Sequence, residues 1–254
     1  KENAASSSPS MAVAYDSRNF SRDFAEVTAL TMCANGIKTY LFSSLRPTPE
    51  LSFAVRTLGC TSGVVVTASH NPKEYNGYKV YWDDGGQIIA PHDTGIIDEV
   101  RAVEGAIPSI EREEALEKGL LVEIDREIDD AFVELIKSYS LRPQLLKERG
   151  CELKVVFTPL HGTGTMMVER ILSEAGINVI TVPEQREPDG NFPTVEFPNP
   201  EEAPAMKMAL DLAKKEHADL VMGTDPDADR LGIAVPDASG EFVLLNGNQL
   251  GSLL

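Results

Sequence analysis

The stretch GVVVTASHNPKEYNGYKVYWDD, residues 63–84, decides the fold of the first half of the chain. Its apolar, β-branched start is typical of a buried strand, and an Asn-Pro pair then turns the chain. The second run alternates polar and apolar residues, which predicts another strand that ends at a glycine turn. Ser69 and His70 therefore stand in a loop that follows a buried strand.

Predicted strands and helices alternate on both sides of this stretch. MAVAYD, residues 11–16, predicts a strand, and the helix after it has Ser21 as its N-cap and Gly36 as its stop. A second strand and a helix that ends at Gly59 lead into the quoted stretch. Beyond it, residues 92–139 have a helical and heavily charged pattern.

The second half of the chain repeats this order. LKVVFTP, residues 153–159, predicts a strand, which a glycine loop and a helix ending at Gly176 follow. Another strand, a proline-rich excursion over 183–200 and a helix lead to the strand DLVMGTD, residues 219–225. A hairpin turned at DASG comes next.

A boundary between the two halves is predicted in SLRPQLLKERGCE, where Pro143 and Gly150 punctuate a charged segment. We therefore predict an α/β fold of two consecutive domains, residues 1–140 and 151–254, each a mixed sheet flanked by helices. In such sheets, ligands bind at the carboxyl ends of the strands. Three motifs stand there, and they contain Ser69, His161 and Asp225.

The formal net charge of −17 argues against two classes of partner. A nucleic-acid surface needs clustered Lys and Arg, and an anionic membrane would repel this chain. A small phosphorylated substrate is compatible if a local cationic pocket or a metal overrides the global field. Scattered cysteines, the polar start KENAASSSPS and the lack of a membrane-length apolar run predict a cytoplasmic protein without a signal peptide.

The segment GTDPDADRLG, residues 223–232, carries the strongest chemical signal. In an extended segment, the spacing of Asp225, Asp227 and Asp229 points all three carboxylates the same way. Converging anions need a cation between them, and such hard oxygen ligands suit Mg²⁺ or Ca²⁺. The EF-hand interpretation fails because its sixth position, a glycine, is Arg230 here. An arginine beside the cage indicates a site for metal and phosphate together, and the alternative is a loop of solvated aspartates.

Ser69 is a candidate phosphoryl carrier. No GxSxG motif surrounds it, and the adjacent His70 need not face its hydroxyl, so a serine hydrolase is not favoured. A serine oxygen can accept a phosphoryl group while a metal offsets the charge. If the loop doubles back, Lys79 returns near Ser69 as a possible base. The alternatives are a plain polar turn and a solvated lysine on an edge strand.

Two further motifs carry weaker signals. PLHGTG, residues 159–164, offers backbone N–H groups to an anion, but it is neither a dinucleotide-binding nor a Walker motif. His161 within it is either a cleft residue or a buried, hydrogen-bonded side chain. Arg18, in YDSRNFS, is either a phosphate clamp or a surface arginine.

Together, YDSR, TASHNP with NGYKVY, TPLHGTG and GTDPDADR resemble the motifs of the α-D-phosphohexomutases, the phosphoglucomutase and phosphomannomutase superfamily. They occur in the family's order from about Met11 onward, and SLRPTPELSFAVR and DDGGQIIAPHD are most similar to the phosphoglucomutase branch. The resemblance covers only the first two of the family's four domains. We therefore expect a truncated chain that is inactive alone and that belongs with C-terminal domains of the same protein.

The resemblance implies a Mg²⁺-dependent isomerase that converts a hexose 1-phosphate into a hexose 6-phosphate. Ser69 would become a phosphoserine, and the three aspartates would hold Mg²⁺ together with a phosphate oxygen on Ser69. Lys79 would be a general base, and His70 would support the phosphate. A sugar bisphosphate of the glucose 1,6-bisphosphate type would be the intermediate and activator. The remaining candidate residues, for binding the phosphorylated sugar, are Arg230, Arg18 and His161.

The choice of sugar stays open, because the loop that reads the sugar in the family belongs to its third domain. A phosphopentomutase or a phosphomannomutase of the same family is therefore an alternative. A metal-dependent phosphatase is an alternative of another class, because a site that admits water hydrolyses a phosphoserine. A non-catalytic fragment that binds only metal or phosphate is the third.

Overall fold

The structure, a computed structural model, describes residues 8–253. Most of the polar start, for which no signal peptide is predicted, therefore lies outside the described residues. The chain divides into two compact units. The first unit comprises the residues up to Tyr15, Phe20–Thr67 and Gly77–Ile128, and the second comprises Asp16–Asn19, Ala68–Asn76 and the residues from Asp129 onward.

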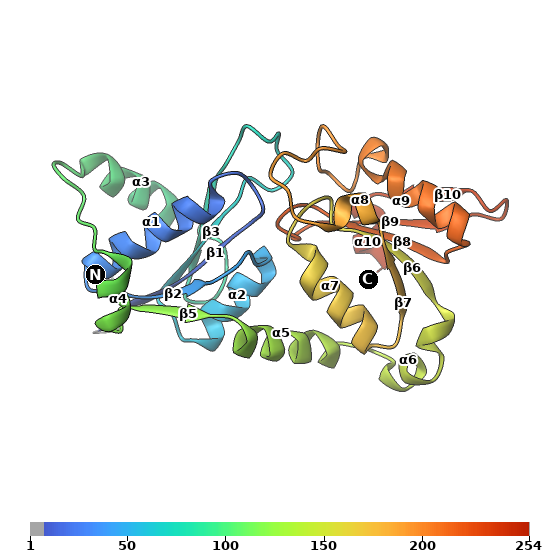
Figure 1. The fold of residues 1–254 in the computed structure, drawn as a ribbon, viewed down its shortest axis with the longest axis horizontal. Helices are drawn as coiled ribbons and strands as arrows, with labels where there is room; N and C mark the ends of the chain where they lie inside the picture. The colour runs from blue at the N-terminus through green and yellow to red at the C-terminus, as the bar shows by residue number, and fades with distance from the viewer. Residues whose placement is uncertain (1–7, 254) are drawn as a thin grey trace. The chain divides into compact units, whose positions relative to one another are not determined.

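The first unit is a mixed five-stranded sheet with helices on both faces (Figure 1). The strand order is β4-β3-β1-β2-β5, in which only β4 runs antiparallel to its neighbour. The strands are β1 (Ser10–Tyr15), β2 (Lys38–Phe42), β3 (Ser62–Val66), β4 (Tyr78–Trp82) and β5 (Leu121–Ile124). The helices are α1 (Ser21–Ala34), α2 (Thr48–Thr57), α3 (His92–Ala102), α4 (Arg112–Glu117) and the start of α5 (Arg126–Ser138).

Two apolar clusters hold this sheet between its helices. Successive side chains of a strand point to opposite faces, so Ala12 and Val13 of β1 belong to different clusters. Ala12 packs in the cluster that contains Leu51 of α2, and Val13 packs in the one that contains Ala29 of α1. All four side chains are fully buried, so helices pack on both faces of the sheet. This packing holds the strands in place, and with them the loops that follow their carboxyl ends.

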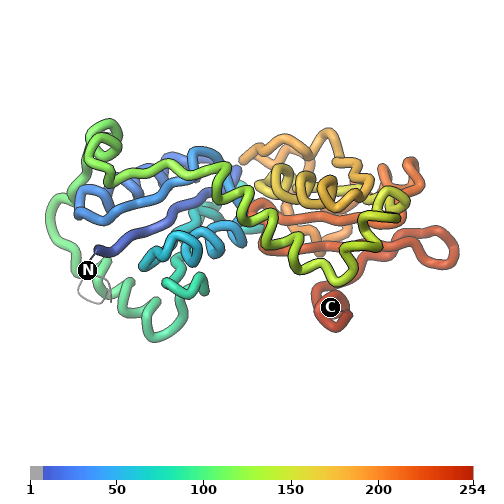
Figure 2. The backbone as a smooth tube through the Cα atoms, turned by 90° about the horizontal axis from the view of Figure 1, so that it is seen from below, coloured from blue at the N-terminus to red at the C-terminus, as the bar shows by residue number. Residues whose placement is uncertain are grey.

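The second unit contains another mixed five-stranded sheet, with the order β10-β9-β8-β6-β7. The hairpin between β9 and β10 extends from this sheet as a loop, drawn in red-orange in Figure 2. The strands are β6 (Lys154–Thr158), β7 (Asn178–Thr181), β8 (Leu220–Thr224), β9 (Leu231–Pro236) and β10 (Phe242–Leu245). The helical segments after α5 are α6 (Pro143–Arg149), the 3₁₀ turn η1 (Gly150–Glu152), α7 (Gly164–Glu174), α8 (Pro183–Arg186), α9 (Ala203–Glu216) and α10 (Gly247–Leu253).

The two sheets share one topology over four strands. In each, the first strand is flanked in parallel by the second and third, and the fourth runs antiparallel beside the third. Ser69 follows the third strand of its sheet, β3, and Asp225 follows the third strand of the other, β8. The predicted fold class, two α/β domains with mixed sheets, is thereby confirmed. Both motifs stand at the carboxyl end of an equivalent strand.

Two local features differ from the predicted pattern. The stretch 92–139, predicted to be helical, contains β5, a strand of the sheet whose Leu121 and Ile124 are buried in the two apolar clusters. A four-residue edge strand between charged helices is too short to outweigh the helical pattern around it. Helix α1 begins at Ser21, which is therefore not its N-cap, and Phe20 takes the cap position with φ 67°. Gly36 follows this helix with φ 70°, as a stop residue does.

The compact units and the predicted domain ranges differ at the boundary. The division falls between Ile128 and Asp129, inside α5, and the segment predicted as a linker forms α6 and η1. The ranges 1–140 and 151–254 remain a prediction about domains. Across residues 8–253, none of the helices combines the length and the apolar character needed to cross a membrane.

Candidate functional site

Three segments of the second unit bring together most of the predicted site residues. Asp16–Asn19 contributes Arg18, Ala68–Asn76 contributes Ser69 and His70, and the rest of the unit contributes the remainder. Lys79 lies on β4 of the first unit, where it pairs in register with Val65, and its role as a base stays a prediction.

The acidic loop after β8 brings three carboxylates together. One oxygen each from Asp225, Asp227 and Asp229 lies within 4.8 Å of the others. Asp225 and Asp227 are fully buried, whereas Asp229 is exposed. Burying like charges side by side is costly, so this arrangement fits a hard divalent cation with oxygen ligands. The donor set suits Mg²⁺ or Ca²⁺ better than a softer metal, because it contains neither sulfur nor nitrogen.

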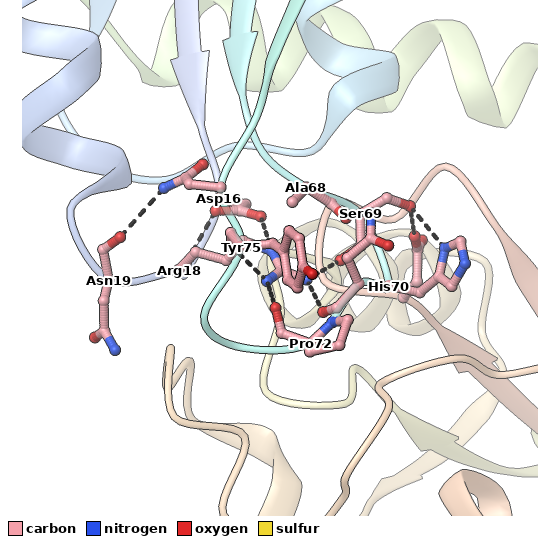
Figure 3. A network of polar contacts seen from close by, with 11 residues as sticks. Asp16, Arg18, Asn19, Ala68, Ser69, His70, Pro72 and Tyr75 are labelled. Atoms are coloured by element: carbon pink, nitrogen blue, oxygen red, sulfur yellow. Dashed lines mark hydrogen bonds and ion pairs between the residues drawn. The ribbon is translucent and has the colours of Figure 1, made fainter.

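The Ser69 hydroxyl faces this acidic loop. Its Oγ donates a hydrogen bond of 2.5 Å to Oδ2 of Asp225 and lies 3.3 Å from Nδ1 of His70 (Figure 3). Ser69 has φ 51°, in the left-handed region that residues other than glycine adopt rarely, and only 8% of its surface is exposed. Surrounding contacts therefore hold the serine against its local preference, with its oxygen beside the carboxylates.

Burial and crowding change how this cluster binds protons. Burial, reinforced by the charge of Asp227, raises the pKa of Asp225 to about 8, while the hydrogen bond from Ser69 opposes the rise. Burial, followed by the positive charge of Arg230, lowers the pKa of His70 below its ordinary value. His70 is therefore neutral at neutral pH, and the acidic loop favours either a proton or a cation.

The stability of the metal-free chain is expected to fall as the pH rises from about 4 to 8, because of Asp225. Its pKa is about 8 when folded and roughly 4 when unfolded. A group whose pKa is raised by folding contributes its full stabilisation at pH values below its unfolded pKa. This stabilisation is lost as the pH rises through the folded pKa. Thermal melts of the wild type and Asp225→Asn test this, because the stability difference between them isolates the group. If the melting temperatures of the wild type and Asp225→Asn changed with pH in the same way, the raised pKa of Asp225 would be contradicted.

The glycine loop before α7 supports the acidic loop. Thr163 N–H donates to the carbonyl of Pro226 at 2.8 Å. A Cβ built on Gly162 would lie 2.4 Å from Cα of Pro226, so only glycine permits this approach. The loop PLHGTG, predicted to offer N–H groups to an anion, thus directs at least one of them to the backbone between Asp225 and Asp227.

His161 is only 2% exposed, and its ring faces protein oxygens. Nε2 lies 2.8 Å from Oγ1 of Thr194, and Nδ1 lies 3.3 Å from the carbonyl of Glu187. These contacts correspond to the buried, hydrogen-bonded alternative weighed for this residue. Its predicted substrate-binding role has no further support in this geometry.

Arg230 is the exposed cation of the site. Its backbone N–H donates to Oδ1 of Asp225 at 3.0 Å, and its guanidinium lies 3.7 Å from a carboxylate oxygen of Glu201. The side chain is 42% exposed, so it is available to an incoming anion. Arg18, in contrast, is 3% exposed and reaches in among the backbone oxygens of the loop that holds Ser69 and His70 (Figure 3).

Phe192 contributes to the packing around Arg18, a role that the sequence does not indicate. Its ring lies under the Arg18 guanidinium, 5.0 Å from Cζ to the ring centroid. The residue belongs to the proline-rich excursion, whose composition predicts an irregular loop and says nothing of what that loop packs against. An aromatic residue among turn residues is the one local signal that could have drawn attention to it.

Two family models match the chain. The first is described as "Phosphoglucomutase/phosphomannomutase, alpha/beta/alpha domain I" and matches residues 2–106. The second carries the same description for domain II and matches residues 130–240. Together they cover most of the sequence and contain all four motifs on which the resemblance rests.

Curated relatives match nearly the whole chain. The "Probable phosphomannomutase" of Haemophilus influenzae is 42% identical over 253 residues, which are 97% of this chain and 50% of that protein. The "Phosphoglucomutase" of Staphylococcus aureus strain USA300 is 41% identical over 263 residues, with 99% of this chain and 45% of that protein covered. The chain thus spans about half the length of these relatives.

Solved structures agree on the fold. A Thermus thermophilus protein named as a phosphomannomutase superposes on this chain with a TM-score of 0.75 at 28% sequence identity. The match covers 93% of this chain and 50% of the Thermus chain. A phosphoglucomutase/phosphomannomutase family protein from Burkholderia thailandensis reaches 0.71 at 23% identity, with 92% and 48% covered, and supports the fold alone.

Proposed function

This chain belongs to the phosphoglucomutase/phosphomannomutase family, a family of isomerases, and we propose that it supplies the phosphoryl-carrying and metal-binding half of such an enzyme. The complete protein would convert a hexose 1-phosphate into a hexose 6-phosphate through a sugar bisphosphate. One observation carries the proposal: the Ser69 oxygen lies 2.5 Å from Asp225, within a cluster of three carboxylates.

Each half of the cycle is a transfer between oxygens. In the first half, a hydroxyl oxygen of the hexose 1-phosphate attacks the phosphorus carried by phosphorylated Ser69, so that a bond from phosphorus to this sugar oxygen forms, the Oγ–P bond breaks and the sugar becomes a bisphosphate. The hydroxyl proton goes to a base, for which Lys79 is the candidate. In the second half, Ser69 Oγ attacks the other phosphorus of the bisphosphate, the Oγ–P bond forms again, the bond from phosphorus to the sugar oxygen breaks, and the released oxygen takes up a proton to give the hexose 6-phosphate. A covalent carrier divides one very slow reaction into two easier steps.

Charge has to be offset throughout this transfer. A divalent cation, Mg²⁺ in our proposal, supplies a Lewis acid that neutralises charge on the moving group. Asp225, Asp227 and Asp229 would hold it, with an oxygen on the modified Ser69 as a further ligand. The exposure of the Arg230 side chain, 42%, supports a role for its guanidinium in pairing with a phosphate. His70, neutral at neutral pH, can donate a hydrogen bond to the same group.

Ser69→Ala is expected to abolish phosphoryl uptake. The chain would be incubated with Mg²⁺ and glucose 1,6-bisphosphate, and its intact mass would be measured. The wild type should gain one phosphoryl group and Ser69→Ala none, because the acceptor oxygen is removed. Ser173→Ala, which removes an exposed hydroxyl on α7, is the matched control and should behave as the wild type. A phosphoryl group retained in Ser69→Ala would rule out the carrier assignment.

Phosphate release separates the mutase from the phosphatase alternative. A chain that takes up the group and liberates inorganic phosphate steadily would be a hydrolase. The isomerase activity itself belongs to the complete protein, because the curated relatives are about twice as long as this chain. Comparing glucose, mannose and ribose 1-phosphates on that protein identifies the sugar. A cytoplasmic location, and the lack of isomerase activity in this chain alone, remain parts of the proposal.

A further inference from the structure

Arg18 is buried, and its guanidinium donates to the backbone of one loop. Nη2 lies 2.6 Å from the carbonyl oxygen of Ser69 and 2.5 Å from that of Asn71. Nη1 lies 2.9 Å from the carbonyl of Pro72 and 3.0 Å from that of Tyr75. Four carbonyls of the loop between β3 and β4 thus converge on one side chain, which lies more than fifty positions earlier in the sequence.

The guanidinium itself is held on its remaining sides. Asp16 accepts from the Arg18 backbone N–H at 2.9 Å and pairs with Nε at 3.4 Å, and neither side chain of this pair is exposed. The ring of Phe192 lies against the guanidinium. A Cβ on Gly190 would lie 2.5 Å from the backbone nitrogen of Asn19, so the segment carrying Phe192 packs tightly on the segment carrying Arg18.

We propose that Arg18 is a positioning residue, which holds the 68–76 loop so that the Ser69 oxygen faces the acidic cluster. The proposal rests on the proposed function for its consequence, because the loop carries the candidate phosphoryl acceptor. Arg18 donates directly to the Ser69 carbonyl, and Ser69 has a left-handed backbone that needs support from outside the loop. A planar fork of five N–H donors can serve four carbonyls at once, whereas a lysine ammonium has three donors at one point.

The assignment differs from a phosphate clamp in what it predicts for kinetics. A residue that binds the substrate phosphate changes the concentration of substrate needed for half-saturation. A residue that only places the serine changes the rate at saturation and leaves half-saturation alone. A displacement of about 1 Å in a reacting atom costs about 100-fold in rate.

Hydrogen–deuterium exchange tests the structural part without reference to activity. The amides of Asn71 and Tyr75 donate to the carbonyls of Ala68 and Pro72 within the loop. Arg18→Lys should speed their exchange by on the order of tenfold, because the loop opens more often. Phe192→Leu, which leaves all four carbonyl contacts possible, should give a smaller increase in the same peptides. Unchanged exchange in Arg18→Lys would overturn the proposal.

Phosphoryl uptake from glucose 1,6-bisphosphate tests the functional part. Arg18→Lys should lower the rate at saturating bisphosphate by about 100-fold and leave the half-saturating concentration within about twofold. Arg142→Lys, the same change at an exposed arginine of the second unit, is the matched control and should change neither quantity. A raised half-saturating concentration with an unchanged maximal rate would make Arg18 a substrate ligand and overturn the proposal.

The two arms separate the two claims. If the wild type takes up no phosphoryl group, the proposed function fails, while faster loop exchange in Arg18→Lys still supports Arg18 as the support of the loop. If the wild type is phosphorylated and Arg18→Lys leaves both the exchange and the uptake rate unchanged, the proposed function stands and the positioning role fails. Circular dichroism and melting curves establish that the variants are folded, and Phe192→Leu replaces Arg18→Lys if the latter is not.

Discussion

Asp227→Asn is expected to lower the affinity of the chain for Mg²⁺ by about 100-fold and its rate of phosphoryl uptake by about 1,000-fold. Asp227 is fully buried beside Asp225, so its charge acts on a cation through little intervening water. The asparagine retains the shape and one oxygen but loses the charge. Affinity is measured from the Mg²⁺-dependent rise in melting temperature, and uptake is measured by intact mass.

Asp229→Asn is the matched control within the same cluster. Asp229 is exposed, so water already screens its charge, and the same substitution should weaken Mg²⁺ binding by only about tenfold. If the two variants lost the same amount of Mg²⁺ affinity, burial would not determine how strongly each carboxylate contributes to metal binding. If neither variant changed the response to Mg²⁺, the three carboxylates would not form a metal site.

Opposite effects on stability and function are expected for the buried carboxylates. Converging negative charges destabilise the metal-free fold, so Asp225→Asn should raise the melting temperature of the metal-free chain above pH 8 while weakening its response to Mg²⁺. Residues kept at a cost to stability are typical of functional sites. This expected trade-off distinguishes a metal site from a loop of solvated aspartates, in which the same substitution would leave stability nearly unchanged.

The parts of the site that local sequence predicted are those that depend on spacing. Alternating aspartates after an apolar strand predicted converging carboxylates, and the serine after a buried strand predicted an oxygen at a sheet edge. Shared topology then brings the two loops to equivalent places, Ser69 after β3 and Asp225 after β8. Their hydrogen bond spans 156 positions, and the family resemblance made the two motifs parts of one site.

Arg18 illustrates what local sequence does not predict. The alternatives weighed for it were a phosphate clamp and a surface arginine, whereas its donors reach four backbone carbonyls. Every residue has a carbonyl, so an arginine that binds carbonyls leaves no pattern among its partners. The strand β5 was missed for a related reason, because its stability comes from pairing with β2, far away in the sequence, rather than from a long pattern of its own.

Gly162→Ala is expected to destabilise the chain by about 3 kcal/mol and to weaken Mg²⁺ binding with it. The added methyl would lie 2.4 Å from Cα and 2.6 Å from the carbonyl oxygen of Pro226, and neither atom can rotate away. The backbone between Asp225 and Asp227 would therefore have to move. Chemical denaturation measures the loss, and the Mg²⁺-dependent melting shift measures the displacement of the ligands.

Gly95→Ala is the matched control, because it adds the same methyl inside helix α3 with nothing within 4 Å of it. It should stabilise the chain by about 0.5–1 kcal/mol, since alanine favours a helix over glycine by that amount, and should leave Mg²⁺ binding unchanged. If the same added methyl group destabilised the chain at position 162 and stabilised it at position 95, the close approach of Gly162 to Pro226 would be identified as the cause. A stable Gly162→Ala with normal Mg²⁺ binding would show instead that the acidic loop does not depend on this support.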